Sequence, residues 1–333
     1  MKRNILTLFL TVVLLLSACS SEATPAPASN QDPEPVTVTE PTEAPMPEPT
    51  EEPGTEMMVF EDDMGNMFEL DGYPQAIVSI SASTTEILFA IGAGGQVVGR
   101  DEYSIYPEEA LEVTNIGAMW EELPAEAILA LEPDLIVAAQ IISEDQVTAL
   151  RDLGLKVYWQ ANPTSYEELW ENLRDFAKLT GHEDETEDLI ADLEARVAAV
   201  QDKTATVNER PSVFYELDAT DPSNPWTAGT GTFIDYIINQ AGGSNAASAL
   251  EGEYAQISSE QLIAVNPDII LLADAPYGTT PESVAERPGW DVIAAVQEKA
   301  LYPIDPNMMS VPGPRLVDAL EITAGLLHPE LFE

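Results

Sequence analysis

Residues 126–137 read EAILALEPDLIV, and residues 260–271 read EQLIAVNPDIIL. Each copy begins with a Glu, continues in a pattern typical of a short apolar helix, turns at Pro-Asp and enters an apolar run typical of a strand. The spacing of 134 residues between the copies is too long for a solenoid array. Pro-Asp is also a common helix-to-strand connection, but the matching Glu favours a true repeat. The repeat predicts two similar α/β lobes that face each other across a cleft, a common place to hold a small molecule.

Strands alternate with helices on both sides of the repeat. The strand patterns fall at 76–80, 97–100, 134–139 and 156–160 in the first lobe, and at 212–217, 268–273 and 301–304 in the second. Helical patterns lie between them, and one of these opens with the capping-box sequence Ser83-Thr84-Thr85-Glu86. Alternation of this kind predicts mostly parallel sheets with right-handed crossovers.

The segment 165–205 contains no strand pattern. It predicts a helix from a capping box at Ser165 to Thr180, a break at Gly181-His182 and a longer amphipathic helix over 183–203. We therefore expect a helical bridge at 165–205 between an N-terminal lobe at 59–164 and a C-terminal lobe at 206–333. A long helix at this junction would make a stiff hinge.

The first nineteen residues are typical of a secretion signal. A positive start at Lys2 and Arg3 precedes an apolar run over 5–16, which is too short for a stable membrane span. The run ends in Leu-Ser-Ala-Cys at 16–19, which resembles a bacterial lipobox, so we expect a lipid on Cys19 and an extracytoplasmic protein anchored to the cell membrane. An ordinary signal peptide with a chance cysteine is the alternative. Because Cys19 is the only cysteine, the chain has no intramolecular disulfide and no multi-cysteine metal site.

The next segment, 20–58, contains nine Pro and nine acidic residues and shows almost no apolar periodicity. A segment of this composition does not bury enough apolar surface to fold, and its prolines and like charges keep it extended. It predicts a disordered tether between the membrane and the folded part. The whole chain has a net charge of −46, which excludes a basic face for nucleic acid and is also consistent with a salty or warm habitat.

Catalytic signatures are missing from the sequence. Its two histidines, His182 and His328, are predicted at exposed helix ends, and neither accompanies a nucleophile motif. A bare transition-metal site needs imidazoles or thiolates at short spacing, which this chain does not offer, so only a site made entirely of carboxylates stays open. We expect a binding protein with no catalytic residues, no metal ligands and no catalytic cofactor.

Four aromatic residues in loop-like segments are candidates for the cleft: Tyr103, Trp120, Trp226 and Tyr254. Trp120 and Tyr254 each precede the Glu of their repeat by six residues, which favours equivalent roles. Large aromatic side chains suit the stacking of a bulky, flat ligand, although each could instead fill the core of its own lobe. Glu126 and Glu260 begin their helices, where the helix dipole alone favours a carboxylate. As equivalent acids on two lobes, they could also dock onto the basic sockets of a roughly two-fold partner.

The chain resembles the periplasmic or lipoprotein substrate-binding proteins for cobalamin, ferric siderophores and haem. The resemblance covers about residues 58–331 and is carried by SISASTTEILFAIGAGGQVVG (79–99), NIG (115–117), PAEAILALEPDLIVA (124–138), AGG (241–243), YAQISSEQLIAVNPDIIL (254–271), RPGW (287–290) and VPGPRLVDALE (311–321). It implies a type III periplasmic-binding fold, in which a long α-helix joins the two lobes. It also implies delivery of a ligand to an ABC permease dimer with its ATPase, with Glu126 and Glu260 pairing with permease arginines. A monomer is expected.

The resemblance is less specific for the ligand. The four aromatic positions are closest to those of cobalamin binders, so a corrinoid is the favoured ligand, with Ser81, Ser83 and Thr84 at a helix N-terminus bonding its polar groups. Siderophore binders tend to place Arg in the cleft, and Arg287, Arg100 and Arg315 are the candidates here. Haem is a further alternative. From another class, a surface sensor or interaction module on the same fold remains open.

Overall fold

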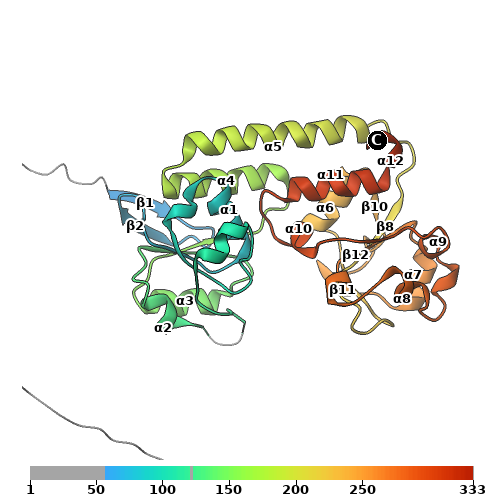
Figure 1. Cartoon of the computed structure of the whole chain (residues 1–333), viewed down its shortest axis with the longest axis horizontal. Helices are drawn as coiled ribbons and strands as arrows, with labels where there is room; N and C mark the ends of the chain where they lie inside the picture. Colours follow the sequence, from blue (N-terminus) through green and yellow to red (C-terminus); the bar gives the residue numbers. More distant parts are fainter. Residues whose placement is uncertain (1–56, 121–122, 333) are drawn as a thin grey trace, which may run out of the picture. The chain divides into compact units, whose positions relative to one another are not determined.

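The computed structural model describes residues 57–120 and 123–332 (Figure 1). The predicted signal peptide, Cys19 and residues 20–56 of the predicted tether lie outside these residues. Within the described part of the chain, none of the helices combines the length and the apolar character that a membrane span requires.

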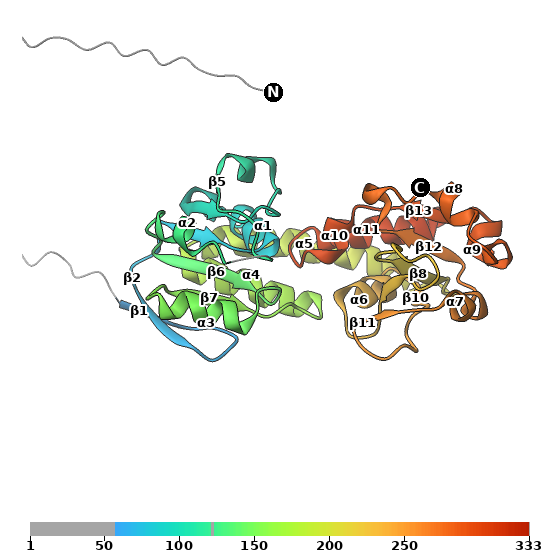
Figure 2. The ribbon, with the colours of Figure 1, turned by 90° about the horizontal axis from the view of Figure 1, so that it is seen from below.

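The N-terminal lobe is built on a five-stranded parallel sheet in the order β5-β4-β3-β6-β7. Its strands are β3 (Ile77–Ser79), β4 (Val97–Arg100), β5 (Thr114–Asn115), β6 (Leu135–Ala139) and β7 (Val157–Gln160). An antiparallel hairpin of β1 (Met57–Glu61) and β2 (Met67–Asp71) precedes it. Helix α3 (Glu144–Asp152) packs beside β7 (Figure 2).

The C-terminal lobe is built on a four-stranded parallel sheet in the order β10-β8-β12-β13. Its strands are β8 (Ser212–Glu216), β10 (Ser244–Asn245), β12 (Ile269–Leu272) and β13 (Leu301–Pro303). A separate antiparallel ribbon pairs β9 (Trp226–Ala228) with β11 (Tyr254–Gln256). The structure therefore confirms two α/β lobes with mostly parallel sheets.

The helices connect the strands and cover the sheets. Beside α3 they are α1 (Ala82–Ala90), α2 (Ala125–Leu129), α4 (Tyr166–Thr180), α5 (Glu183–Thr204), α6 (Phe233–Gln240), α7 (Ser259–Val265), α8 (Pro281–Ala285), α9 (Ala294–Gln297), α10 (Pro306–Ser310), α11 (Leu316–Leu327) and α12 (Pro329–Phe332). The two helices predicted in the bridge segment are observed as α4 and α5. Gly181 adopts a left-handed conformation between them, as expected for a glycine that ends a helix.

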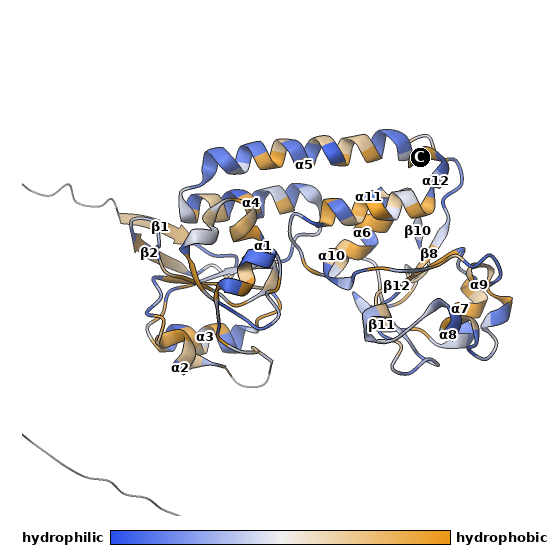
Figure 3. Cartoon of the chain, in the orientation of Figure 1, coloured by the Kyte–Doolittle hydropathy of each residue, from blue (hydrophilic) through white to orange (hydrophobic). Residues whose placement is uncertain are grey.

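Alternation along the central strands divides the apolar residues between the two faces of each sheet. In β12, Ile269 and Leu271 belong to one buried cluster, whereas Ile270 and Leu272 belong to another. The first of these clusters continues through α4, α5, α6 and α11 and includes residues of both lobes. Figure 3 shows apolar residues along α11 and a mixture of polar and apolar residues along α5. One continuous core under these helices therefore joins the lobes.

Aromatic and charged contacts add to this shared core. Tyr166 of α4 packs edge-on against Phe233 and Tyr236 of α6, with ring centroids 5.4 Å apart in each case. Glu86 of α1 accepts hydrogen bonds from the backbone N–H of Arg315 at 3.0 Å and from its Nε at 2.8 Å. These contacts hold the two lobes together at the bridge, and the stiffness of the hinge stays a prediction.

The Asp of each repeat has the same role in its lobe. An Asp134 carboxylate oxygen accepts the backbone N–H of Gln75 and of Ala76, and Asp134 donates its own N–H to the Ala76 carbonyl. Asp268 likewise accepts the N–H of Ser212 and donates its N–H to the Ser212 carbonyl. Each Asp therefore fixes the register of its strand against the first strand of the sheet, which explains why both copies carry Pro-Asp before the strand.

Three local predictions are wrong in full or in part. Ser165 accepts the N–H of Glu168, but the Glu168 carboxylate accepts from Thr164 and not from Ser165, so only half of the predicted capping box forms there. Helix α1 begins at Ala82 with Ser81 as N-cap and has no side-chain capping bond, so Ser83 to Glu86 is not a capping box. The Glu86 carboxylate is turned to Arg315 instead. His328 ends α11 but is buried, because its ring packs against Gly242, whose carbonyl lies 3.2 Å from Nε2.

Candidate functional site

An exposed aromatic pair marks the N-terminal lobe. Tyr103 and Trp120 lie edge to face, with ring centroids 5.8 Å apart. Their exposed fractions are 52% and 55%, so neither ring fills the core of its lobe. Tyr103 follows β4, and its backbone N–H bonds to the Asp101 carboxylate at 3.0 Å. The structure therefore brings together two of the four predicted aromatic residues.

A second exposed pair lies on the β9–β11 ribbon of the C-terminal lobe. Trp226 is opposite Gln256, and Tyr254 lies two residues before Gln256 on the same strand. Side chains two residues apart on a strand share one face, so Trp226 and Tyr254 are diagonal neighbours on the ribbon. They are 41% and 52% exposed. Partial burial raises the pKa of Tyr254, with the nearby Glu253 adding to the shift, so its hydroxyl stays protonated and can donate a hydrogen bond.

One pocket has walls from both lobes, and we call it the interlobe pocket. The N-terminal lobe contributes Gln140 and 162–164, which follow β6 and β7. The C-terminal lobe contributes 231–234, Glu253, Tyr254, Met309, Ser310, Pro312 and Leu316. The carboxyl ends of parallel strands meet at one edge of a sheet, which is where ligands bind in open α/β folds. Tyr254 belongs to this lining, whereas Tyr103, Trp120 and Trp226 do not.

The predicted polar residues at the start of α1 are buried. Ser81 and Ser79 each place their hydroxyl 2.7 Å from the Thr84 hydroxyl. The Thr85 hydroxyl lies 2.7 Å from that of Ser79 and 2.9 Å from that of Ser104. Ser83 is buried as well. The Ser81 and Thr84 hydroxyls thus hold the loop after β3 in place, and their role in ligand binding stays a prediction.

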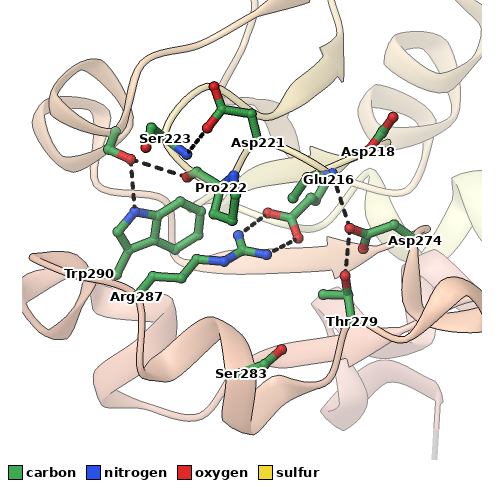
Figure 4. Close-up of polar contacts among 12 residues, drawn as sticks. Glu216, Asp218, Asp221, Pro222, Ser223, Asp274, Thr279, Ser283, Arg287 and Trp290 are labelled. Carbon is green, nitrogen blue, oxygen red and sulfur yellow. Dashed lines mark hydrogen bonds and ion pairs between the residues drawn. The ribbon is translucent and has the colours of Figure 1, made fainter.

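Arg287 forms an ion pair inside the C-terminal lobe. Its guanidinium donates to both carboxylate oxygens of Glu216, one of them at 2.8 Å, and lies over the Trp290 ring, 4.5 Å from its centroid (Figure 4). All three residues are buried. Burial raises the pKa of Glu216, and the bonds from Arg287 oppose the shift. The guanidinium is therefore engaged within the protein, and its predicted role in ligand binding remains untested.

A further pocket, which we call the acidic pocket, was missed in the sequence. Its lining consists of Leu217, Asp218, Ala219, Thr220, Asp274, Tyr277, Gly278 and Thr279. An Asp274 carboxylate oxygen accepts from the Thr279 hydroxyl at 2.8 Å and from the Ala219 N–H at 3.2 Å (Figure 4). Asp218 and Asp274 directly follow the predicted strands 212–217 and 268–273. Their place at the carboxyl edge of the sheet was the signal that could have revealed this pocket.

Glu126 and Glu260 occupy equivalent places on the surface. Each lies in the first turn of its helix, α2 or α7, and each is exposed. The α7 helix begins with a complete capping box between Ser258 and Gln261, which fixes the position of Glu260. The α2 helix follows Pro124 without a side-chain cap. Both carboxylates are therefore available to a partner.

Metal-binding geometry is not found among residues 57–120 and 123–332, where no three His, Cys, Asp or Glu side chains gather as a metal site would require. His182 is half-buried and places Nδ1 3.1 Å from the Thr180 carbonyl, while the other described histidine, His328, is buried. The chemistry that this site offers is recognition, through aromatic faces, hydroxyls and carboxylates.

Comparison with known proteins agrees with this architecture. A family model described as "Periplasmic binding protein" matches residues 77–308. An uncharacterized ABC transporter substrate-binding lipoprotein, YvrC of Bacillus subtilis, is 31% identical over 265 residues, which are 78% of this chain and 82% of that protein. A cobalamin-binding protein of Halobacterium salinarum is 28% identical over 278 residues, covering 81% and 74% of the two chains.

A solved structure has the same fold. The periplasmic heme-binding protein RhuT from Roseiflexus sp. RS-1, in its apo form, superposes with a TM-score of 0.69 at 29% identity, and the match covers 78% of this chain and all of that one. The relatives thus carry different ligands, and the fold by itself does not select among them.

Proposed function

Since the chain belongs to the periplasmic binding protein family, we propose that it captures a large metal chelate outside the cytoplasm and delivers it to an ABC importer. The binding role carries no covalent chemistry. The observation that carries the proposal is the pair of exposed aromatic residues on each lobe, Tyr103 with Trp120 and Trp226 with Tyr254. Large apolar faces left open to solvent on both lobes suit a ligand that is held between them.

A corrinoid is the favoured ligand. The flat faces of a corrinoid ring can stack on the four aromatic side chains. The hydroxyls and amides of the interlobe pocket, such as Gln140, Asn162 and Ser310, bond the amide groups at the edge of the corrinoid. The similarity to a cobalamin-binding protein supports the same ligand. A ferric siderophore or haem is the second candidate, supported by the heme-binding structure of the same fold.

Two features support a role at a membrane importer. The lipobox-like sequence at 16–19 supports a lipid on Cys19, which would hold the protein at the outer face of the cell membrane. Glu126 and Glu260, exposed and equivalent on the two lobes, suit docking onto arginines of the permease dimer. A long acidic segment between the lipid and residue 57 would let the folded part reach the permease.

Binding is tested with the full chain titrated with cyanocobalamin, haem and a panel of ferric siderophores. Saturable quenching of tryptophan fluorescence and a raised melting temperature identify the ligand. The Trp120→Ala and Trp226→Ala variants should each weaken binding of that ligand at least about tenfold, because each removes an indole ring on which the ligand stacks. Tyr73→Ala, which removes an exposed ring at the α4–α5 turn, is the control and should bind normally. No response to any chelate would reject the proposal.

Docking is tested separately from binding. The double variant Glu126→Ala/Glu260→Ala should keep its ligand affinity and lose import into cells, because only the contact with the permease is removed. Glu282→Ala/Glu298→Ala, two other surface acids, serves as the control and should import normally. Unchanged import by the first variant would show that these carboxylates are not the docking contacts and would leave room for the alternative of a surface sensor.

A further inference from the structure

The charges near the cleft carry information on the class of ligand. We propose that the cleft selects chelates whose outer groups are neutral or cationic hydrogen-bond donors, such as carboxamides, and excludes chelates with several carboxylate or catecholate anions. This inference rests on the proposed function, because it concerns the ligand of the same cleft.

The arginines of the described residues are all engaged within the protein. Four are paired with carboxylates on the surface or between helices and strands: Arg151 with Asp62, Arg174 with Glu187, Arg196 with Asp318 and Glu321, and Arg315 with Glu86. Arg287 is held by Glu216. The other two, Arg100 and Arg210, donate to backbone carbonyls. Each of these guanidinium groups therefore already has a partner, and none of them lines either pocket.

The lysines of the described residues lie away from the cleft. Lys156 and Lys299 come just before β7 and β13, at the amino edges of the two sheets, whereas the cleft residues follow the carboxyl ends of the strands. A four-residue strand such as β7 separates the two edges by roughly 13 Å. Lys178 pairs with Asp175 near the end of α4, and Lys203 lies over the Phe332 ring at the end of α5. Neither the interlobe pocket nor the acidic pocket is lined by a lysine or an arginine.

The charged side chains that line the two pockets are carboxylates. Glu253 lines the interlobe pocket, and Asp218 and Asp274 line the acidic pocket. Asp274 is only 5% exposed, so its negative charge acts on the pocket at short range rather than through direct contact. Carboxylates around a pocket favour a ligand that brings hydrogen-bond donors. An anionic ligand would instead lose its hydration and meet like charges.

Pairs of ligands that differ in charge but little in shape test the inference. The full chain is titrated with cyanocobalamin and with its derivatives in which peripheral carboxamides are hydrolysed to carboxylates, and with haem dimethyl ester and haem. Tryptophan quenching gives the affinities at low and at high salt. In whichever pair binds, the uncharged ligand should bind at least about tenfold more tightly than the charged one. This difference in affinity should shrink at high salt.

A charge reversal gives a second, independent readout. Glu253→Lys places a cation beside the interlobe pocket. It should reduce the preference for the uncharged ligand over its carboxylate form, or reverse that preference. Glu298→Lys adds the same charge at an exposed site after α9 and should leave the preference as it is.

The outcomes separate the two proposals. Equal or tighter binding of the anionic member of each pair, with no response to Glu253→Lys, would overturn the charge selectivity while leaving the transport proposal in place. Binding of neither member of either pair, and of no other chelate, would overturn the proposed function and the selectivity with it.

Discussion

At the scale of single residues, the Arg287–Glu216 pair has a consequence for stability. Both side chains are buried, and removal of one partner leaves an uncompensated charge. We expect Arg287→Met to lower the free energy of unfolding by about 3–5 kcal/mol, measured by urea denaturation. The double variant Arg287→Met/Glu216→Leu should recover most of this loss, because two apolar groups of similar volume replace the ion pair.

An exposed ion pair is the matched control for this prediction. Arg174 and Glu187 form two hydrogen bonds at 2.7 and 3.0 Å, but both side chains are open to solvent. Arg174→Met should therefore change stability little. If Arg287→Met unfolds at the same urea concentration as the unchanged protein, the buried pair is not a structural support, and Arg287 becomes a stronger candidate for ligand binding.

The residues of the candidate site were partly predictable. Tyr103, Trp120, Trp226 and Tyr254 lie in loop-like segments of the sequence, where a large aromatic side chain either reaches the surface or fills the core, and the structure shows all four exposed. The partner of Arg287 could not be predicted, since Glu216 lies 71 residues earlier at the end of an otherwise apolar strand. Likewise, the hydroxyls of Ser81 and Thr84 find partners only once β3 and α1 are folded against each other.

At the scale of elements, the junction of α4 and α5 depends on one glycine. Gly181 has a φ of 79°, and a Cβ there would lie 2.8 Å from the Tyr73 ring. Gly181→Ala should destabilise the protein by about 1–3 kcal/mol, because an L-residue is strained in this conformation and the ring must move. Thermal or urea denaturation measures the change.

A second glycine gives the control for this junction. Gly95 has no positive φ, and a Cβ there would meet nothing within 4 Å, so Gly95→Ala should be tolerated. A Gly181→Ala variant as stable as Gly95→Ala would mean that the turn adapts, and the bridge would then be less constrained than its geometry indicates.

The elements were predicted well where their periodicity is strong. The strands β3, β4, β6, β7, β8, β12 and β13 and the helices α4, α5 and α7 lie within a few residues of their predicted places. The ribbon of β9 and β11 was missed because strands of three residues carry almost no alternation. The α3 helix was missed too, since it is rich in charged residues, although Ser143 and Gln146 form a capping box at its start.

At the scale of the whole molecule, buried carboxyl groups make stability depend on pH. Burial raises the pKa of Glu86 and of Glu216 above 4.5, and burial also raises the pKa of Asp101 above 3.8. A group with a raised pKa in the folded state stabilises that state fully below its unfolded pKa, and the contribution is lost as the pH rises through the folded pKa. The net charge of −46 adds self-repulsion at high pH.

We therefore expect the melting temperature to rise as the pH falls from about 8 to about 5, measured by calorimetry at constant ionic strength. Glu86→Gln should reduce this slope, whatever its effect on stability at neutral pH, because it removes one of the titrating groups. Glu187→Gln is the control and should leave the slope unchanged, since Arg174 lowers the pKa of the exposed Glu187 and this carboxyl therefore stays ionised over the whole range. A melting temperature that falls steadily as the pH is lowered over this range would show that protonation of these buried carboxyl groups does not stabilise the folded state.

The bonds of Asp134 and Asp268 to the first strands of their sheets bear on how each lobe is tied together. The two sheets differ, with five strands in one and four in the other. In both, however, the Asp of the repeat accepts a backbone N–H at or just before the start of the first strand. Each bond closes a loop of similar length, 58 residues in one lobe and 56 in the other, so the same long-range contact aligns the strands of two sheets that otherwise differ.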